Sequence, residues 1–136
     1  MCIRDSYEYE KIGIVGENAY PILIQHDGTE MFRKISEWYK ANFEGWGLKI
    51  SQISGNIQSY EIALQTDGIK PINLVNVGQG IHQVLPLIIR SYLPIKKETL
   101  IIIEEPDTHL HPAAHGSLAQ RFVESYLEDN LSLIHI

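Results

Sequence analysis

Two adjacent glutamates, Glu104 and Glu105, end an apolar run in the stretch LIIIEEPDTHLHP, which extends from Leu100 to Pro112. Ligands of an open α/β sheet gather at the carboxyl ends of its strands, and side chains alternate along a strand. One carboxylate can therefore hold Mg2+ through water while the other orients an attacking water. Hydrolysis of a nucleoside triphosphate requires these two roles. The alternative is that the pair merely ends a strand at the solvent.

The elements around the pair predict an α/β layer. The stretch TLIIIE is apolar up to its glutamate, which is typical of a central parallel strand buried on both faces. Before it, NVGQGIHQVLPLIIRSYL begins with two glycines and continues as a helix that Pro86 either shortens or bends. After it, the loop PDTHLHP leads to a second amphipathic helix. The apolar positions of that helix are Ala119, Phe122, Val123, Tyr126 and Leu127.

The first half of the chain predicts a helix followed by a β-hairpin. Residues Tyr7 to Ile24 predict short extended pieces joined by a loop. A helix is expected from about Thr29 to Asn42, with Asp27 or Thr29 as its N-cap and EGWG at its end. LKISQIS and SYEIALQT then predict an antiparallel hairpin, and TDGIKPINL a turn and a short strand.

Length and composition limit the class of protein. The 136 residues suffice for one domain with a core, and 44% hydrophobic residues is ordinary for a soluble globular protein. A formal net charge of -6 argues against nucleic-acid binding driven by overall charge. No apolar run is long enough to span a membrane, so we expect no membrane partner. One cysteine, Cys2, fits a reducing compartment, and we expect a cytoplasmic location.

The two ends of the chain, MCIRDS and LSLIHI, resemble translated adapter sequence. We therefore expect residues 1–6 and 131–136 not to belong to the fold. The alternative is an ordinary frayed N-terminus and a short C-terminal strand. With the ends excluded, we expect residues 7–130 to be a window from a longer protein.

The stretch IIIEEPDTHLHP resembles the Walker B and D-loop region of ABC-type ATPases, in the branch of the OLD nucleases and the RecF/SMC-like ATPases. NVGQGIHQVLPLI resembles the signature segment of a bacterial subfamily in that branch, and the two motifs occur in the expected order. The resemblance is strong from Val75 to Val123 and weaker from Gly13 to Gln65. It implies a partial P-loop NTPase fold: the C-terminal lobe of an ABC-type ATPase head, with a parallel core strand and flanking helices.

The resemblance also implies roles for individual residues, with ATP and Mg2+ as ligands. Glu104 matches the acidic position that holds Mg2+ through water, and Glu105 matches the catalytic glutamate. The signature loop is Gly78, Gln79 and Gly80, which would contact the γ-phosphate bound to the other subunit of a homodimer of heads. Glycines let backbone amides approach a ligand, and a helix start favours an anion. The D-loop at the dimer interface comprises Asp107 to His111, including His109.

Several positions depart from the family pattern. Gly78 stands where a signature serine is usual, Asn76 and Asp107 replace the usual Asp and Glu, and His82 replaces a small polar residue. The sequence contains no G-x-x-x-x-G-K-[ST] string to cradle phosphates. We therefore predict that the 136-residue chain alone does not hydrolyse ATP, although the intact protein does.

Two other patterns have weaker functional interpretations. His109, His111 and His115 form H-x-H-x-x-x-H, which is compatible with zinc if Asp107 adds a fourth ligand, but a loop without metal is favoured. Trp38, Tyr39, Phe43 and Trp46 could stack nucleic-acid bases, although their helical spacing favours core packing.

The favoured function is therefore an ATP-hydrolysing head linked to DNA maintenance or anti-phage defence, with DNA or a nuclease as partner; the biological link rests on the family alone. A first alternative is an ATPase module that gates an OLD-type nuclease. A second is an ATP-sensing scaffold that does not hydrolyse ATP. A third is a small domain that is complete at this length.

Overall fold

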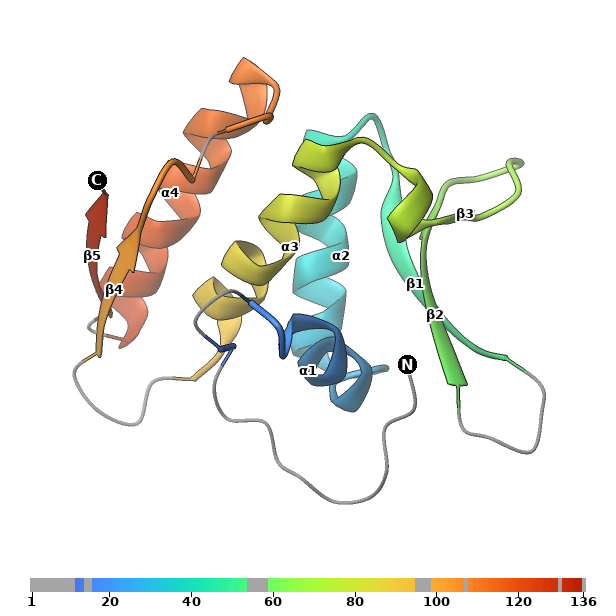
Figure 1. Ribbon diagram of the computed structural model, residues 1–136, viewed down its shortest axis with the longest axis horizontal. Coiled ribbons are helices and arrows are strands. Elements are labelled where there is room, and N and C mark those ends of the chain that lie inside the picture. The colour runs from blue at the N-terminus through green and yellow to red at the C-terminus, as the bar shows by residue number, and fades with distance from the viewer. Residues whose placement is uncertain are drawn as a thin grey trace.

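The fold is described from a computed structural model, which places residues 12–13, 16–53, 59–94, 99–106, 108–129 and 131–135 (Figure 1). In chain order the elements are α1 (Ala19–Gln25), α2 (Glu30–Asn42), β1 (Gly47–Ile53), β2 (Ser59–Gln65), β3 (Ile72–Asn73), the 3-10 turn η1 (Leu74–Asn76), α3 (Gln79–Tyr92), β4 (Thr99–Ile103), α4 (Pro112–Asp129) and β5 (Leu131–His135). No helix in these ranges is long and apolar enough to cross a membrane.

The strands form two separate sheets. Strands β1, β2 and β3 are antiparallel, and Gly47 of β1 lies opposite Gln65 of β2, which confirms the predicted hairpin. Strands β4 and β5 are parallel, with Thr99 opposite Leu131, and α4 is the crossover between them. Figure 1 shows α2 and α3 in the middle, the hairpin on one side and α4 with the parallel pair on the other. The mixed α/β class is thus as predicted.

Helix α2 begins and ends as its sequence predicts. Thr29 is the N-cap, and its side chain accepts a hydrogen bond from the backbone amide of Phe32, so the capping role falls to Thr29 and not to Asp27. At the other end the amide of Gly45 bonds to the carbonyl of Lys40, which is the Schellman pattern. The residue between cap and glycine, Glu44, adopts a left-handed φ of 49°.

Helix α1 corrects the prediction of extended structure before Ile24. Residues Ala19–Gln25 are helical even though they include a proline. Pro21 lies in the first turn, where a backbone amide has no partner within the helix, so its missing N–H costs little. The side chains of Ile22 and Leu23 are fully buried, and this packing against the core stabilises a helix too short to be stable alone.

Helix α3 is continuous from Gln79 to Tyr92 and includes Pro86. Its buried side chains form the centre of the core with those of α1, α2 and the hairpin. The largest fully buried residues of the core are Tyr39, Ile22, Leu23, Ile35, Leu74, Leu85, Ile88, Ile89 and Val84. Pro86 instead contacts the loop before α1, because a side chain at Gly16 would lie 2.7 Å from Pro86 Cβ. Glycine at position 16 therefore permits a close approach of loop and helix.

Strand β4 is parallel, as predicted, but it is not buried on both faces. Ile101 and Ile103 pack partly against the core, whereas Ile102 on the opposite face is 58% exposed. Alternation along the strand explains the difference, because the core covers the face of Ile101 and Ile103. Strand β5, within residues 131–136, pairs with β4 along its whole length. The adapter origin of 131–136 stays a prediction, and residues 1–6 lie outside the described ranges.

Candidate functional site

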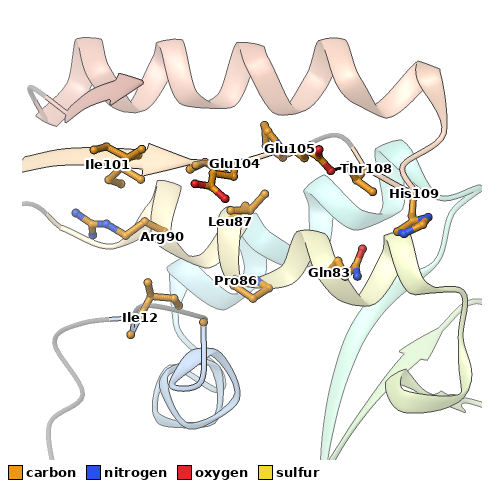
Figure 2. A pocket seen from close by; sticks show the side chains of 15 residues that line it. Ile12, Gln83, Pro86, Leu87, Arg90, Ile101, Glu104, Glu105, Thr108 and His109 are labelled. Atoms are coloured by element: carbon orange, nitrogen blue, oxygen red, sulfur yellow. Dashed lines mark hydrogen bonds between the residues drawn. The ribbon is translucent and has the colours of Figure 1, made fainter. Parts of the chain in front are cut away.

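A cleft of about 710 Å³ lies between α3, β4 and the loop that follows β4. Figure 2 shows the acidic end of β4 and Thr108 on one side of it and Gln83 and Pro86 of α3 on the other. The lining residues are Ile12, Gly13, Gly16, Gln83, Pro86, Leu87, Arg90, Ile101 to Pro106, Thr108 and His109. Its volume is within the range of small-molecule sites, and its acidic end is where the sequence predicts the reaction centre.

The structure places Glu104 and Glu105 together at the end of β4, with both side chains exposed in the cleft. Glu105 adopts a left-handed φ of 46°, which costs a residue with a side chain about 1–2 kcal/mol. The turn after it holds this conformation, because the Thr108 amide donates to the Glu105 carbonyl at 3.1 Å. The hydroxyl of Thr108 also donates to Glu105 Oε2 at 3.1 Å. The carboxylate of Glu105 is therefore held in a defined orientation.

The histidines of the predicted D-loop have separate structural environments. His109 lines the cleft and has a left-handed φ of 65°. His111 Nδ1 accepts a hydrogen bond from the Ala113 amide in the first turn of α4. His115 Nε2 lies 3.1 Å from the carbonyl oxygen of Leu110. Asp107, the remaining predicted D-loop residue, lies outside the described residues.

Across the described ranges, no three His, Cys, Asp or Glu side chains are grouped so that they could hold a metal ion. The three histidines therefore do not form the zinc site weighed as an alternative. Two neighbouring carboxylates do fit Mg2+, which binds few protein ligands and takes its other oxygens from water and phosphates. Glu104 and Glu105 are the residues that would hold it or its water.

The predicted signature loop, Gly78 to Gly80, is adjacent to the loop that follows β4 in the same chain. That loop begins with Glu104 and Glu105 and is called the acidic loop. Gly78 is the N-cap of α3, and both Gly78 and Gln79 are exposed. Among the described residues no side chain caps the helix, and the first amides of a helix have no partner within it. Gly80 is buried instead, and a side chain there would overlap the carbonyl oxygen of His109. The ligand roles of the three residues stay predictions.

The aromatic residues of α2 belong to the core. Trp38 is 9% exposed and Tyr39 is fully buried, and their rings meet edge to face with centroids 5.8 Å apart. Burial raises the pKa of the Tyr39 hydroxyl well above its ordinary value, and the neighbouring Tyr20 raises it further. These two rings cannot stack on nucleic-acid bases in this conformation, which supports the predicted core role.

The sequence pattern predicts no individual role for Thr108, which lies within the predicted D-loop, or for Gln83 on α3. Thr108 orients Glu105, and Gln83 faces the acidic loop from α3 (Figure 2). The signal for Thr108 was its position three residues after a glutamate in a turn, where a hydroxyl commonly bonds back. Gln83 lies one helical turn after Gly80, on a face that the apolar pattern leaves unassigned.

A solved structure described as "Structural biochemistry of ATP-driven dimerization and DNA stimulated activation of SMC ATPases" is similar to this chain. The TM-score is 0.57 at 18% sequence identity, and the match covers 87% of this chain and 71% of that one. At this identity the likeness shows the fold alone, which is the α/β fold of a P-loop NTPase, as predicted. None of the curated proteins matches the chain.

A family model matches residues 9–133, which is most of the chain. That family is one of ATPase domains, and it implies nucleotide binding, typically with Mg2+. The chain therefore belongs to the family described as "AAA domain, putative AbiEii toxin, Type IV TA system".

Proposed function

We propose that this chain carries the metal-binding and water-directing carboxylates of an ATP-hydrolysing site in an ABC-type head of the OLD, RecF and SMC-like branch. One observation carries the proposal: Glu104 and Glu105 lie together at the carboxyl end of a parallel strand and line the same cleft. Such strand ends are the usual ligand sites of α/β sheets, and a merely terminal acidic pair would not need a cleft.

The two carboxylates would have different roles in hydrolysis. Glu104 would hold Mg2+ through a water molecule, and the ion, when bound, would neutralise the charge of the β- and γ-phosphates. Glu105 would orient the attacking water and accept its proton. The hydrogen bond from Thr108 would keep the Glu105 oxygen atoms directed into the cleft while ATP binds.

The intact protein would work as a homodimer of heads. The exposed Gly78 and Gln79, together with Gly80, would contact the γ-phosphate held by the other subunit, and Asp107, His109 and His111 would lie at the interface. The similar SMC ATPase structure is described by its ATP-driven dimerization, which supports this arrangement. Exposure of the start of α3, which no described side chain caps, supports it independently, because its amides can donate hydrogen bonds to an anion from outside the chain.

The downstream function we propose is DNA maintenance or anti-phage defence. The family description names a toxin–antitoxin system, and the SMC ATPase is described as DNA-stimulated. An OLD-type nuclease gated by the ATPase is the alternative within this class, and DNA cleavage that requires both Mg2+ and ATP would favour it. A scaffold that senses ATP without hydrolysis would bind Mg-ATP with no turnover.

Single substitutions in the intact protein test the assignment. Glu105→Gln should lower ATP turnover by about 10²–10⁴-fold and leave Mg-ATP binding in place, because the amide can neither accept the proton nor orient the water as well. Glu104→Gln should weaken the Mg2+ dependence of binding itself. Steady-state hydrolysis and calorimetric titration with Mg-ATP measure the two quantities separately.

Glu37→Gln is the matched control, because Glu37 is an exposed glutamate on α2 outside the cleft. It should leave both turnover and binding as in the wild type. Normal turnover by the Glu105→Gln protein would contradict the proposed function. ATP hydrolysis by the 136-residue chain alone, abolished by Glu105→Gln, would contradict the expectation that this chain needs further residues to hold the phosphates.

A further inference from the structure

The first turn of α3 rests directly on the backbone of the loop that follows the acidic pair. A side chain added at Gly80 would overlap the carbonyl oxygen of His109 and lie 2.8 Å from its carbonyl carbon and 3.2 Å from Leu110 N. These are backbone atoms, so they cannot rotate away as a flexible side chain would. Leu110 is buried and His109 has a left-handed φ, which further restricts the loop.

Both ends of α3 are attached to other elements by hydrogen bonds, one part-buried and one buried. Near the start, the hydroxyl of the fully buried Tyr39 donates to the carbonyl of Ile81 at 2.9 Å. At the end, Arg121 Nη2 of α4 donates to the carbonyl of Ser91 at 2.8 Å. The helix is therefore attached to α2 near its start and to α4 at its end, about three turns apart, and tilting it would break these hydrogen bonds.

We propose that Gly80 is a positioning residue. Because it has no side chain, the signature loop packs directly against the acidic loop, and the two loops of one chain move as a single unit. The proposal rests on the proposed function, in which Glu104 and Glu105 serve the nucleotide of their own subunit while Gly78 and Gln79 serve that of the partner. A shift of the acidic loop at one site would then shift the phosphate-contacting amides at the other. Packed interfaces of this kind change between discrete arrangements and transmit small displacements.

Amide exchange of the 136-residue chain, followed by NMR, tests the contact without nucleotide. The probe is the amide of Thr108, which donates a hydrogen bond to the Glu105 carbonyl and should be protected by it. Gly80→Ala should displace the His109 carbonyl, open this turn and speed exchange of the Thr108 amide by about tenfold. This change corresponds to roughly 1.4 kcal/mol, which is within the usual cost of overpacking. The amide resonances of Glu105 and Thr108 should shift as well.

Gly78→Ala is the matched control, because a side chain at Gly78 meets nothing within 4 Å and its φ of -58° suits alanine. It should leave exchange of the Thr108 amide within about twofold of the wild type, as it introduces no clash. A general loss of stability in Gly80→Ala would also speed exchange in the β1–β2 hairpin, for example at Leu64. Exchange that rises equally in the hairpin and at Thr108 would overturn the positioning role.

The wild-type chain gives a second measurement if Gly80→Ala does not fold. The Hα protons of Gly80 should show a nuclear Overhauser effect to the amide proton of Leu110, because these groups are in contact. Absence of this effect, or unchanged Thr108 exchange in a folded Gly80→Ala chain, would overturn the proposal. Either result would leave the hydrolytic role of Glu105 untouched, and a failed hydrolysis test would leave this contact in place.

Discussion

The hydroxyl of Thr108 donates a hydrogen bond to Glu105 Oε2 at 3.1 Å, and the amide of the same threonine donates to the Glu105 carbonyl at 3.1 Å. Both bonds close one turn, in which Glu105 has a left-handed backbone. Strained backbone of this kind persists only where neighbouring interactions hold it, and it is concentrated at functional sites. Thr108 thus determines both the backbone and the side-chain orientation of the residue that we propose directs water.

Thr108→Val should lower ATP turnover of the intact protein by about three- to tenfold. Valine keeps the branched shape but removes the hydroxyl. One hydrogen bond contributes roughly 0.5–1.5 kcal/mol, and the same amount added to the activation free energy gives a rate decrease of this size. Thr66→Val, outside the cleft, is the control and should hydrolyse ATP at the wild-type rate. Equal rates for the two variants would show that Thr108 does not orient Glu105.

Arg121→Met should lower the free energy of unfolding by about 2–4 kcal/mol, measured by urea denaturation of the chain. Arg121 is 5% exposed, its guanidinium donates to the Ser91 carbonyl, and its Cζ lies 4.1 Å from the centroid of the Tyr92 ring. Methionine fills the space but leaves the carbonyl of Ser91 without this donor.

Arg33→Met is the control for the loss of a positive charge. Arg33 is exposed and forms surface ion pairs with Glu30 and Glu37, so its removal should cost less than about 1 kcal/mol. If both arginine variants are equally stable, the link between α3 and α4 does not stabilise the fold.

The stability of the chain should fall as the pH rises above about 10, because of Tyr39. Burial raises the pKa of Tyr39 in the folded state, with a further rise from Tyr20, so the folded protein keeps a proton that the unfolded chain loses at its ordinary pKa of 10.0. The unfolded state then binds fewer protons, and the free energy of unfolding decreases with pH. Below that pH the contribution of Tyr39 is fully present.

Tyr39→Phe tests this titration. The variant should be about 1–2 kcal/mol less stable than the wild type at pH 8, because the carbonyl of Ile81 loses its donor. The difference should shrink as the pH rises through 10, since phenylalanine has no proton to lose. Urea denaturation at pH 8 and above pH 10 measures it, and a constant difference would contradict the assignment.

Glu44→Gly should stabilise the chain by about 1 kcal/mol. Glu44 lies just beyond the cap of α2 with a φ of 49°, a conformation that glycine adopts without steric cost. Gly45→Ala is the opposite control, because Gly45 has a φ of 85° and alanine there should destabilise the chain by at least the same amount. Thermal denaturation of both variants gives the sign of each change, and a destabilised Glu44→Gly chain would contradict the prediction.

Where the sequence pattern was local, it predicted the structure well. Thr29 and the EGWG stretch bound α2, because a cap needs only the neighbouring backbone groups. Alternation predicted the β1–β2 hairpin, and helical spacing predicted α3. The order of these elements then led to the correct α/β class.

Where a structural feature depends on tertiary packing, the sequence pattern predicts it wrongly or not at all. Helix α1 was predicted as extended, because its stability comes from Ile22 and Leu23 in a core that local pattern cannot reveal. Burial of β4 on both faces was wrong, since Ile102 lies on the face that the core does not cover. Residue type could not distinguish these cases, because an isoleucine in a strand has the same propensity on either face.

For the site, the sequence determined which residues are candidates, since a strand followed directly by two glutamates can be read from neighbours in the chain. Only the tertiary structure decided that Thr108 restrains Glu105 and that Gly80 contacts the carbonyl of His109. The physical reason is that contact distances between backbone segments far apart in the chain arise from how α3, β4 and α4 pack. No local propensity encodes those distances.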